Sequence, residues 1–499
     1  LLHILLRTKL LLRLVSPAAM LGAVLAAAPT TNTTPVVAER LSAADANVFF
    51  GYYDLPAVDA PTGRHLAHRV PFRDRLPVAG DEAQLGVINL DVERVFRPFA
   101  RTGAWNFQQG ALLQWLGDGT GRVFYNDVQP EGRGYRGVLH DLATGERTFT
   151  DRALANLSRD GRWGLGVDFD RMHDFRPGYG YAAQDDPREG VPHPADDGIW
   201  VCNLRTGASR LVLSLAALHE RVRALSPLME QKLLVNHLTF NPSASRLVFL
   251  LRNFPAPGPR LARISHQVVD DAKRMSSAEA AMRAREAKPR PRGEAEEGNR
   301  AAARQRGFSN APIPISPSPG AVLPEPGFRI HHPSGEKSGL KGQPAWITAV
   351  FTAARDGSDL RLLVPPGYAS HYHWRDDSTI VFHCDGPDGP QLYEITDATP
   401  PRFAALDREF FKRDGHCSYS PDGRWLLYDS YPDAAGKRHL FLYDLRECRG
   451  RELGAFAALP VSVTDIRCDL HPRWLPDGRI SFDSTHEGFR GLYLIDPKR

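Results

Sequence analysis

Short runs of alternating apolar and polar residues recur along the chain, and Asp-Gly or similar turn pairs separate them. The run "HCSYSPDGRWLLYDS" from His416 and the run "HPRWLPDGRISFDST" from His471 each read strand, turn, strand. Alternation with a period of two indicates half-buried strands, and Asp-Gly between two such runs is a strong hairpin signal. The pattern therefore predicts antiparallel sheets made of consecutive strands.

The same unit can be counted seven times over residues 45–499. The upstream copies open, in chain order, with "GYYDLPAVDAPTGRHLAHRVPF", "ALLQWLGDGTGRVFYNDV", "ALANLSRDGRWGLGVDFD", "HLTFNPSASRLVFLLR" and "HYHWRDDSTIVFHC". Repeats of about 40–50 residues with about four strands each are typical of a β-propeller. We therefore expect an all-β fold, a seven-bladed β-propeller over residues 39–499.

One internal segment departs from the repeat. Residues 259–344 interrupt the fourth unit between its second and third strands, and they are rich first in Ala, Arg, Lys and Glu, then in Pro and Ser. Such a composition cannot bury enough apolar surface to fold on its own. We expect a low-complexity, disordered or partly helical insertion within blade 4.

The first 38 residues have the composition of a targeting segment. They contain no Asp or Glu, and an apolar run that ends in small residues follows Arg7, Lys9 and Arg13. This order is typical of a secretory signal peptide, and an organellar transit peptide is the alternative. We expect residues 1–38 to be a signal or targeting segment, cleaved near Ala28, and the protein to be secreted or periplasmic with no stable membrane insertion afterwards.

Charge and motifs narrow the function classes. The formal net charge is only +4, and no Lys/Arg stripe interleaved with aromatic residues appears, so we expect no nucleic-acid partner. The five cysteines fit neither zinc-finger spacing nor an even disulfide framework. No Walker loop, Gly-x-Ser-x-Gly elbow or His-Glu-x-x-His motif is present, which disfavours nucleotide chemistry and the common hydrolase mechanisms. We expect a monomer.

Histidines recur at one position of the predicted units. His371, His416 and His471 each lie six residues before the turn Asp, and His237 lies six before Ser243, which fills the same place. The first strand of each blade lines the centre of a propeller, so we expect these four imidazoles on one arc around the axis. The alternative is that each hydrogen-bonds a neighbouring blade and only holds the ring closed.

Imidazoles that converge from four blades can bind one metal ion, since neutral imidazole is a ligand for zinc, manganese, iron and copper. His373 lies two residues after His371 on the same strand face, and Cys417 adds a soft ligand next to His416. The predicted ligands of a divalent metal ion, zinc or manganese, are His237, His371, His373, His416, Cys417 and His471.

The segment "DFDRMHDFRPGYGY", residues 168–181, extends the third unit. Its Gly and Pro residues predict a loop, so its aromatic and basic side chains are expected at a surface or over a cleft. Histidine or tyrosine can move a proton while arginine neutralises an anion. The candidate catalytic residues are His173, Arg176, Tyr179 and Tyr181. The alternative is an ordered loop that plugs one face of the propeller.

The repeats "SPDGRWLLYDSYPD", "NPSASRLVFLL" and "LPDGRISFDSTHEG" resemble the propeller repeats of TolB-type proteins. The histidines in register and the His-x-His of "SHYHW" look more like the oligogalacturonate lyases and the related ulvan lyases. The resemblance covers residues 45–258 and 346–499. It implies a seven-bladed propeller that cleaves an anionic, uronic-acid polysaccharide or oligosaccharide by β-elimination. The alternative function is a non-catalytic TolB-like propeller that binds a protein or a glycan.

The resemblance also implies roles for particular residues. In oligogalacturonate lyases three histidines and a glutamine hold a divalent ion, usually manganese; His371 and His373 match the His-x-His pair, and His237 matches the third histidine. Tyr368 stands where the glutamine is expected, so the ligand set differs here and would include His416, Cys417 or His471. In ulvan lyases a histidine and a tyrosine transfer protons and an arginine neutralises the uronate. His173, Tyr179 or Tyr181, and Arg176 are candidates of matching type.

Overall fold

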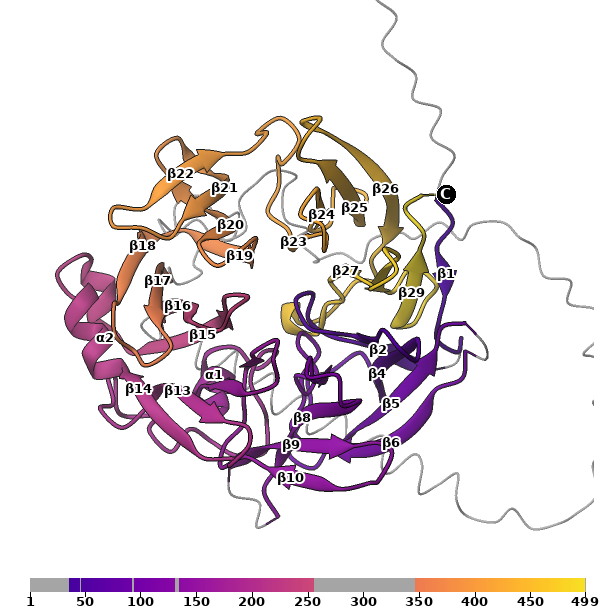
Figure 1. Ribbon diagram of the computed structural model, residues 1–499, viewed down its shortest axis with the longest axis horizontal. Coiled ribbons are helices and arrows are strands. Elements are labelled where there is room, and N and C mark those ends of the chain that lie inside the picture. Colours follow the sequence, from indigo (N-terminus) through magenta and orange to yellow (C-terminus); the bar gives the residue numbers. More distant parts are fainter. Residues whose placement is uncertain (1–35, 45, 92–93, 131–133, 255–345, 499) are drawn as a thin grey trace, which may run out of the picture. The chain divides into compact units, whose positions relative to one another are not determined.

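Seven antiparallel sheets form a ring around a central axis, with consecutive strands running outward in nearly every sheet (Figure 1). The structure, a computed structural model, describes residues 36–44, 46–91, 94–130, 134–254 and 346–498. The predicted all-β, seven-bladed β-propeller is confirmed. Figure 1 shows β15, β19, β23 and β27 as the innermost strands of their blades, as predicted for the strands that carry the four histidines.

Blades 1 to 3 occupy the first half of the described chain. Blade 1 consists of β2 (Asn47–Phe49), β3 (Val58–Asp59), β4 (Arg64–Val70), β5 (Ala83–Asn89) and β6 (Arg97–Thr102). Blade 2 consists of β7 (Gln114–Trp115), β8 (Arg122–Val128), β9 (Tyr135–Asp141) and β10 (Arg147–Phe149). Blade 3 consists of β11 (Asn156–Leu157), β12 (Trp163–Gly166), β13 (Gly198–Asn203) and β14 (Ser209–Ser214).

Blades 4 to 7 complete the ring. Blade 4 consists of β15 (Leu233–Phe240), β16 (Arg246–Asn253), β17 (Thr348–Ala354) and β18 (Arg361–Gly367). Blade 5 consists of β19 (Ala369–Trp374), β20 (Thr379–Gly386), β21 (Gly389–Thr396) and β22 (Arg402–Ala405). Blade 6 consists of β23 (Cys417–Tyr419), β24 (Trp425–Asp429), β25 (Lys437–Asp444) and β26 (Arg449–Ala457). Blade 7 consists of β27 (Arg473–Trp474), β28 (Ile480–Ser484), β29 (Gly491–Ile495) and β1 (Glu39–Arg40).

The two ends of the described chain close the ring together. Strand β1 pairs antiparallel with β29, with Glu39 opposite Leu494 and Arg40 opposite Tyr493. Blade 7 is therefore built from both ends of the described chain, and the compact unit begins at Val36, three residues before the predicted start. This closure was not predicted, because two residues carry too little alternation to be recognised as a strand.

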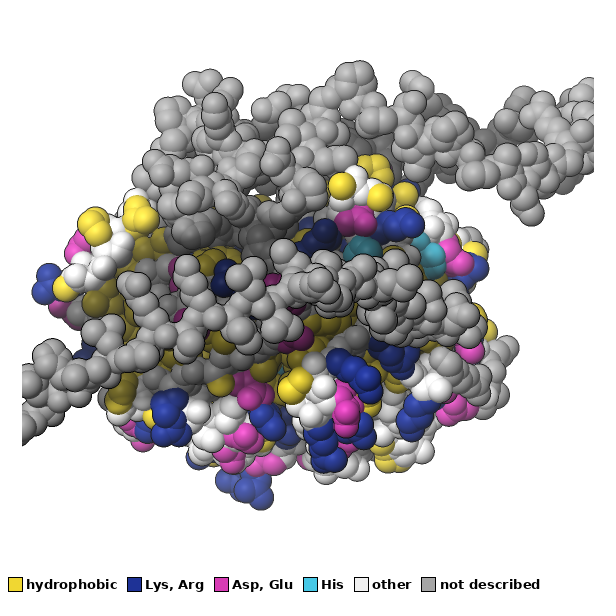
Figure 2. Space-filling model, turned by 90° about the horizontal axis from the view of Figure 1, so that it is seen from above, with side chains coloured by type: hydrophobic (Ala, Val, Ile, Leu, Met, Phe, Trp, Pro, Cys, Tyr) yellow, Lys and Arg dark blue, Asp and Glu magenta, His cyan; other side chains and the backbone are white. Residues whose placement is uncertain are grey.

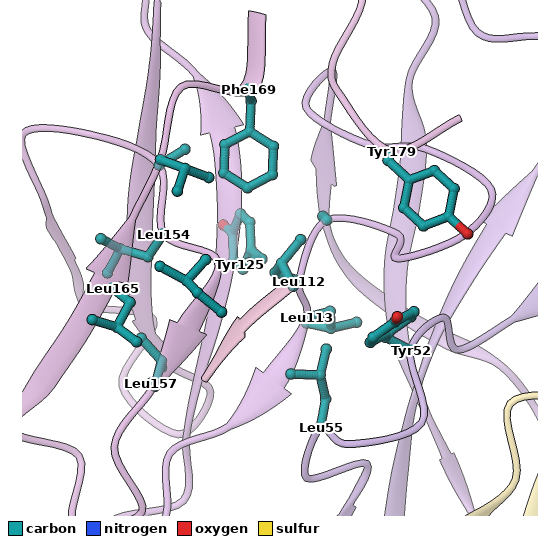
Figure 3. Packing of buried hydrophobic residues seen from close by; sticks show 14 of the residues in the cluster. Tyr52, Leu55, Leu112, Leu113, Tyr125, Leu154, Leu157, Leu165, Phe169 and Tyr179 are labelled. Carbon is teal, nitrogen blue, oxygen red and sulfur yellow. The ribbon is translucent and has the colours of Figure 1, made fainter. Parts of the chain in front are cut away.

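The second strands of the blades are apolar because neighbouring sheets cover both of their faces. In β16, for example, every residue after Arg246 is buried, including Leu247 and Leu251. Such a continuous run is the mark of a strand buried on both sides. Figure 3 shows the core between blades 2 and 3, where Leu154, Leu157 and Leu165 lie at one end and Tyr52 and Tyr179 at the other. Tyr52 and Tyr179 therefore mark the end of the apolar core that lies opposite these leucines (Figure 3).

An Asn or Asp side chain at the end of the second strand forms hydrogen bonds with the backbone of the next blade in three places of the described chain. Asn126 in β8 accepts the amide of Leu154 in blade 3 at 2.9 Å. Asp429 in β24 accepts the amide of His471 in blade 7 at 3.2 Å. Asp483 in β28 accepts the amides of Phe50 and Gly51 in blade 1. These bonds place the first strand of one blade relative to the second strand of its neighbour.

The segment predicted as a surface loop after β12 is different in the structure. It begins with helix α1 (Phe169–Phe175), whose N-cap Asp168 accepts the amides of Asp170 and Arg171. Tyr181 is 0% exposed and packs in the core, so the expectation that the aromatic side chains of this loop lie at a surface or over a cleft was wrong for Tyr181. The Gly and Pro residues here lie only after the helix, and an Asp cap with apolar residues behind it is the signal that the prediction passed over.

In the part of the chain that the structure describes, three further short helices lie in the connections: α2 (Leu215–Val222), η1 (Pro227–Glu230) and η3 (Thr464–Ile466). None of the helices in the described residues is long and apolar enough to cross a membrane. The predicted insertion does fall between β16 and β17, but its own character lies outside the described residues, as does most of the predicted targeting segment 1–38. On the face drawn in Figure 2, Lys and Arg side chains alternate with Asp and Glu side chains.

Candidate functional site

Three of the four predicted imidazoles meet at the centre of the ring. The ring centroids of His371 and His416 are 4.1 Å apart, and those of His416 and His471 are 4.2 Å apart. All three side chains are at most 6% exposed. The histidine arc predicted from the spacing is therefore a contiguous cluster from blades 5, 6 and 7.

The backbone brings these histidines together by different routes. His237 and His471 have φ angles of 44° and 42°, and Leu112, the residue at the corresponding place in blade 2, has 54°. His371 instead lies in an irregularity of the β19–β20 register between Ala369 and Tyr372. A positive φ is uncommon outside glycine, although histidine tolerates it better than most residues. Local strain of this kind is often retained at functional sites.

Carboxylates fix the orientation of two of the imidazoles. His371 donates from Nδ1 to Asp414 at 2.9 Å, and His416 donates from Nδ1 to Asp429 at 3.0 Å. A carboxylate has no hydrogen to donate, so in each ring Nδ1 carries the proton and Nε2 carries the lone pair. Burial raises the pKa of Asp414, but the imidazoles of His371 and His383 outweigh it and hold that pKa below the usual range.

His416 and His471 lie together with the carboxylate of Asp469. Nε2 of each ring is buried and meets no hydrogen-bond partner among the described residues. A ligand atom from each of His416, Asp469 and His471 lies within 4.8 Å of the other two. Burial lowers the pKa of His471, and the neighbouring His416 lowers it further, so its imidazole is neutral. Two neutral imidazoles and a carboxylate are a donor set that fits zinc or manganese.

Asp469 also has two cationic partners. Its carboxylate forms ion pairs with Arg438 at 2.6 Å and with Arg467 at 2.8 Å. Burial opposes ionisation of Asp469, but the two guanidinium groups outweigh it and keep its pKa below the usual range. The carboxylate is therefore charged beside the two unpartnered imidazole nitrogens.

The fourth histidine, His237, belongs to a tyrosine pair. The hydroxyl of Tyr52 lies 2.9 Å from Nδ1 of His237, and the two rings are stacked. The Tyr52 ring also contacts the ring of His471 at 5.2 Å between centroids, so it stands between His237 and the other histidines. Burial raises the pKa of Tyr52 well above its ordinary value and lowers that of His237, which Arg252 lowers further. Tyr52 is thus a protonated phenol beside a neutral imidazole.

Arg252 brings a buried positive charge to this pair. Its side chain is 6% exposed and donates to the hydroxyl of Thr348 at 3.1 Å and to the carbonyl of Ala369 at 3.4 Å. No carboxylate of the described residues forms an ion pair with it. Burial lowers its pKa to about 10, and the nearby Arg176 contributes, so the guanidinium stays charged at neutral pH. A buried charge normally has a counter-ion, so this one favours an anionic ligand.

The four predicted catalytic residues of segment 168–181 separate in the structure. Tyr179 reaches the site: its ring contacts His237 edge-on, and its hydroxyl accepts from Arg467 at 3.1 Å. Arg176 forms an ion pair with Asp465 at 2.8 Å and covers the Tyr179 ring. Tyr181 stacks on Phe169 in the core and accepts from Asn126. His173 lies in helix α1 with a buried Nδ1.

Two predicted metal ligands face other surroundings. His373 contacts the Tyr419 ring at 6.0 Å between centroids, and burial lowers its pKa to about 4. Cys417 packs in an apolar cluster that includes Val381 and Tyr428. Burial and the nearby Asp414 and Asp429 raise the pKa of the Cys417 thiol, which disfavours the thiolate that a metal would require.

Several residues of the site were missed or undervalued by sequence reasoning. Asp429 had a signal, because Tyr125-Asn126, Tyr428-Asp429 and Phe482-Asp483 repeat an aromatic residue before Asn or Asp. Arg252 also had one, since it is a charged residue directly after the apolar run Leu247–Leu251. Arg438 had none, because a single charged residue at the start of β25 is ordinary for a strand end.

Comparison with solved structures identifies the relatives of this fold. An oligogalacturonate lyase in complex with manganese superimposes with a TM-score of 0.52 at 13% sequence identity, covering 93% of this chain and 96% of that chain. The chain has the fold of the oligogalacturonate lyases. A second oligogalacturonate lyase, from Vibrio parahaemolyticus, gives a TM-score of 0.51 at 12% identity over 92% of this chain and 93% of that chain.

The predicted resemblance to oligogalacturonate lyases is therefore confirmed for the fold. TolB from Acinetobacter baumannii, the other resemblance, aligns with a TM-score of only 0.31 at 10% identity over 87% of this chain and 64% of that chain. No family model matches the chain, and no curated protein matches its sequence.

Proposed function

We propose that this protein is a polysaccharide lyase that cleaves an anionic, uronic-acid polysaccharide or oligosaccharide by β-elimination. The observation that carries the proposal is the buried Arg252 guanidinium, without a carboxylate partner among the described residues, beside the hydrogen-bonded pair of Tyr52 and His237. The fold of the oligogalacturonate lyases supports it. Secretion or periplasmic location, which the pattern of residues 1–38 indicates, would bring the protein to such a substrate.

β-Elimination on a uronate needs three groups in one place. The C5 proton is too weakly acidic to leave unless positive charge stabilises the carboxylate as negative charge develops on it. A base must take that proton, and an acid must protonate the oxygen that leaves from C4. Because both proton transfers occur on the same sugar ring, the base and the acid have to be close neighbours.

The residues of the site match these needs. Arg252 would bind the uronate carboxylate through its guanidinium. His237, a neutral imidazole that keeps part of its surface exposed, would accept the C5 proton at Nε2 while its Nδ1–H donates to the Tyr52 oxygen. Tyr52 would give its hydroxyl proton to the leaving oxygen and recover one from Nδ1 of His237 across the 2.9 Å contact.

A divalent ion is the proposed cofactor of this site. His416, His471 and Asp469 would hold it, with His371 alongside, and the similar lyase that was solved in complex with manganese favours that metal over zinc. When bound, the ion would act as a Lewis acid on the substrate carboxylate. His371, His416 and His471 thus keep the metal role that the spacing predicted. His373 and Cys417 are not included, because their rings and thiol face other groups.

The test is a screen of the purified protein against uronate polymers and their oligomers, namely polygalacturonate, ulvan, alginate and heparan sulfate. β-Elimination leaves an unsaturated uronate whose ultraviolet absorbance reports each cleavage. We expect product from at least one substrate, loss of activity with a chelator, and recovery with manganese. If no substrate gives an unsaturated product with manganese present, the proposed function is wrong, and glycan binding becomes the question for a non-catalytic propeller.

A further inference from the structure

Asp429 holds parts of two blades with one carboxylate. Its Oδ1 accepts the backbone amide of His416 at 2.7 Å, and both of its oxygens lie 3.0 Å from Nδ1 of the His416 ring. Its Oδ2 accepts the backbone amide of His471, in the next blade, at 3.2 Å. The side chain is 1% exposed. A single buried carboxylate therefore fixes one imidazole and the backbone that carries a second.

The link between blades does not by itself require a negative charge. Asn126 stands at the corresponding place in blade 2. Its backbone N–H donates to the carbonyl of Ala111, just as the backbone N–H of Asp429 donates to the carbonyl of His416. The side chain of Asn126 forms two hydrogen bonds with Leu154 in the next blade: its Oδ1 accepts from the backbone N–H, and its Nδ2 donates to the backbone carbonyl. A neutral side chain thus joins two blades there. The charge at position 429 has a different task, and the group it meets is the imidazole of His416.

The tautomer of His416 follows from this contact. A carboxylate only accepts, so the hydrogen of the ring stays on Nδ1 and the lone pair stays on Nε2. That Nε2, like Nε2 of His471, is buried and has no hydrogen-bond partner among the described residues. An amide at position 429 can instead donate to Nδ1, which would move the ring hydrogen to Nε2 and remove the lone pair from the site.

We propose that Asp429 is the positioning residue of the histidine cluster: it sets His416 as the Nδ1–H tautomer, with its lone pair on Nε2, and aligns the backbone of His471 so that both rings serve one ligand. This proposal rests on the metal site proposed above for its ligand, a divalent cation. Carboxylates that orient a ligating imidazole in this way typically contribute ten- to a hundred-fold in metal affinity. Blade 2 shows that the repeat itself does not require the arrangement, since Leu112 and Asn126 stand at the corresponding places there.

The first measurement uses the wild-type protein without metal. Nitrogen-15 spectra of histidine-labelled protein report which ring nitrogen of His416 carries hydrogen, with His416→Gln used to assign the signal. We expect hydrogen on Nδ1. Hydrogen on Nε2 would overturn the proposal, and this result does not depend on any variant at Asp429 being folded.

The second measurement compares metal affinity in two variants that make the same chemical change. Asp429→Asn removes the carboxylate beside His416. Asp385→Asn makes the same change at the corresponding place in blade 5, where the carboxylate accepts the amide of Tyr368 at 2.8 Å. Calorimetric titration with manganese and with zinc should show about ten- to a hundred-fold weaker binding for Asp429→Asn and wild-type binding for Asp385→Asn.

The outcomes separate this proposal from the proposed function. Wild-type affinity in a folded Asp429→Asn variant would refute the positioning role. If the wild-type protein binds neither metal while His416 keeps its hydrogen on Nδ1, the metal site of the proposed function fails and the role of Asp429 in setting the tautomer stands. If Asp429→Asn binds weakly but its His416 tautomer is unchanged, Asp429 acts on the blade contact alone and the proposal is wrong.

Discussion

The hydroxyl of Tyr52 lies 2.9 Å from Nδ1 of His237, and the planes of the two rings differ by only 11°. The two residues are 185 positions apart in the sequence and come from blades 1 and 4. The stacked arrangement holds the hydrogen bond in a fixed direction at the centre of the ring, next to His471 and Tyr179. Tyr52 contacts the cluster of His371, His416 and His471, and the buried guanidinium of Arg252 lies near His237.

The first prediction concerns the Tyr52 hydroxyl. Tyr52→Phe keeps the ring and its packing but removes the proton donor, so we expect lyase activity to fall about 10²- to 10⁴-fold, the usual contribution of a general acid or base. Tyr53→Phe is the matched control, because the Tyr53 hydroxyl donates to the backbone carbonyl of Tyr372 and not to a histidine. Initial rates on the substrate found in the screen check both. Equal losses in the two variants would contradict the assignment.

The second prediction separates stability from activity at Arg252. Arg252→Met removes a buried charge that has no carboxylate partner among the described residues, so we expect an unchanged or higher melting temperature. The same change should lower kcat/KM about 10²- to 10³-fold, because the charge on the substrate is no longer neutralised. Arg252→Lys should fall between the two, since a lysine keeps the charge but not the planar fork.

Arg438 provides the contrast for this experiment. It is equally buried but forms a 2.6 Å ion pair with Asp469. Arg438→Met leaves part of that carboxylate without a partner and should lower the melting temperature. Thermal unfolding of both variants checks the difference. A large drop for Arg252→Met would show that its guanidinium is structural.

The third prediction is a loss of stability in mild acid. Burial lowers the pKa of His65 to about 3, with a contribution from Arg473, and lowers that of His68 to about 4. The unfolded chain therefore binds more protons than the folded chain below the ordinary value of 6.5, so stability falls as the pH falls from 6.5 toward 4. Each such histidine contributes about 1.4 kcal/mol per pH unit in that window.

Among the described residues, five carboxyl groups whose pKa is raised by burial act in the opposite direction: those of Asp54, Asp127, Asp168, Asp170 and Asp197. Burial raises the pKa of Asp54 to about 6 and that of Asp170 to about 7, so these groups add stability as the pH falls. The histidines whose pKa is lowered outnumber them and include, besides the two named, His237, His371, His373 and His471. Urea unfolding between pH 4 and 7 checks the slope. His68→Gln should make it shallower by about one histidine's share, and an unchanged slope would contradict the prediction.

The fourth prediction distinguishes Cys417 from its neighbour His416. Because the Cys417 side chain packs among apolar residues, Cys417→Ala should cost about 1 kcal/mol of stability and leave metal content unchanged. His416→Ala should instead remove bound metal. Plasma mass spectrometry of the purified variants, together with their melting temperatures, tests both expectations. Loss of metal from Cys417→Ala would restore the thiol as a ligand.

The sequence alone was sufficient for the architecture. Seven copies of one strand pattern predicted seven blades, because alternation and Asp-Gly turns are local properties that each blade needs for its own hairpins. The same repeats predicted that His371, His416 and His471 share one level near the axis, since equivalent strand positions become neighbours when blades are arranged in a ring. The place of the insertion, between β16 and β17, followed from where the pattern stops and resumes.

Only the tertiary structure decided how the site is composed. A register counted from the turn does not reveal bulges or positive φ angles, so it did not predict that Tyr52 would separate His237 from His471 or that His373 and Cys417 would face other groups. The partners Asp429 and Arg252 come from blades 6 and 4, and no local pattern couples residues across blades. Contacts of that kind depend on how the sheets pack together, which is a long-range property of the closed ring.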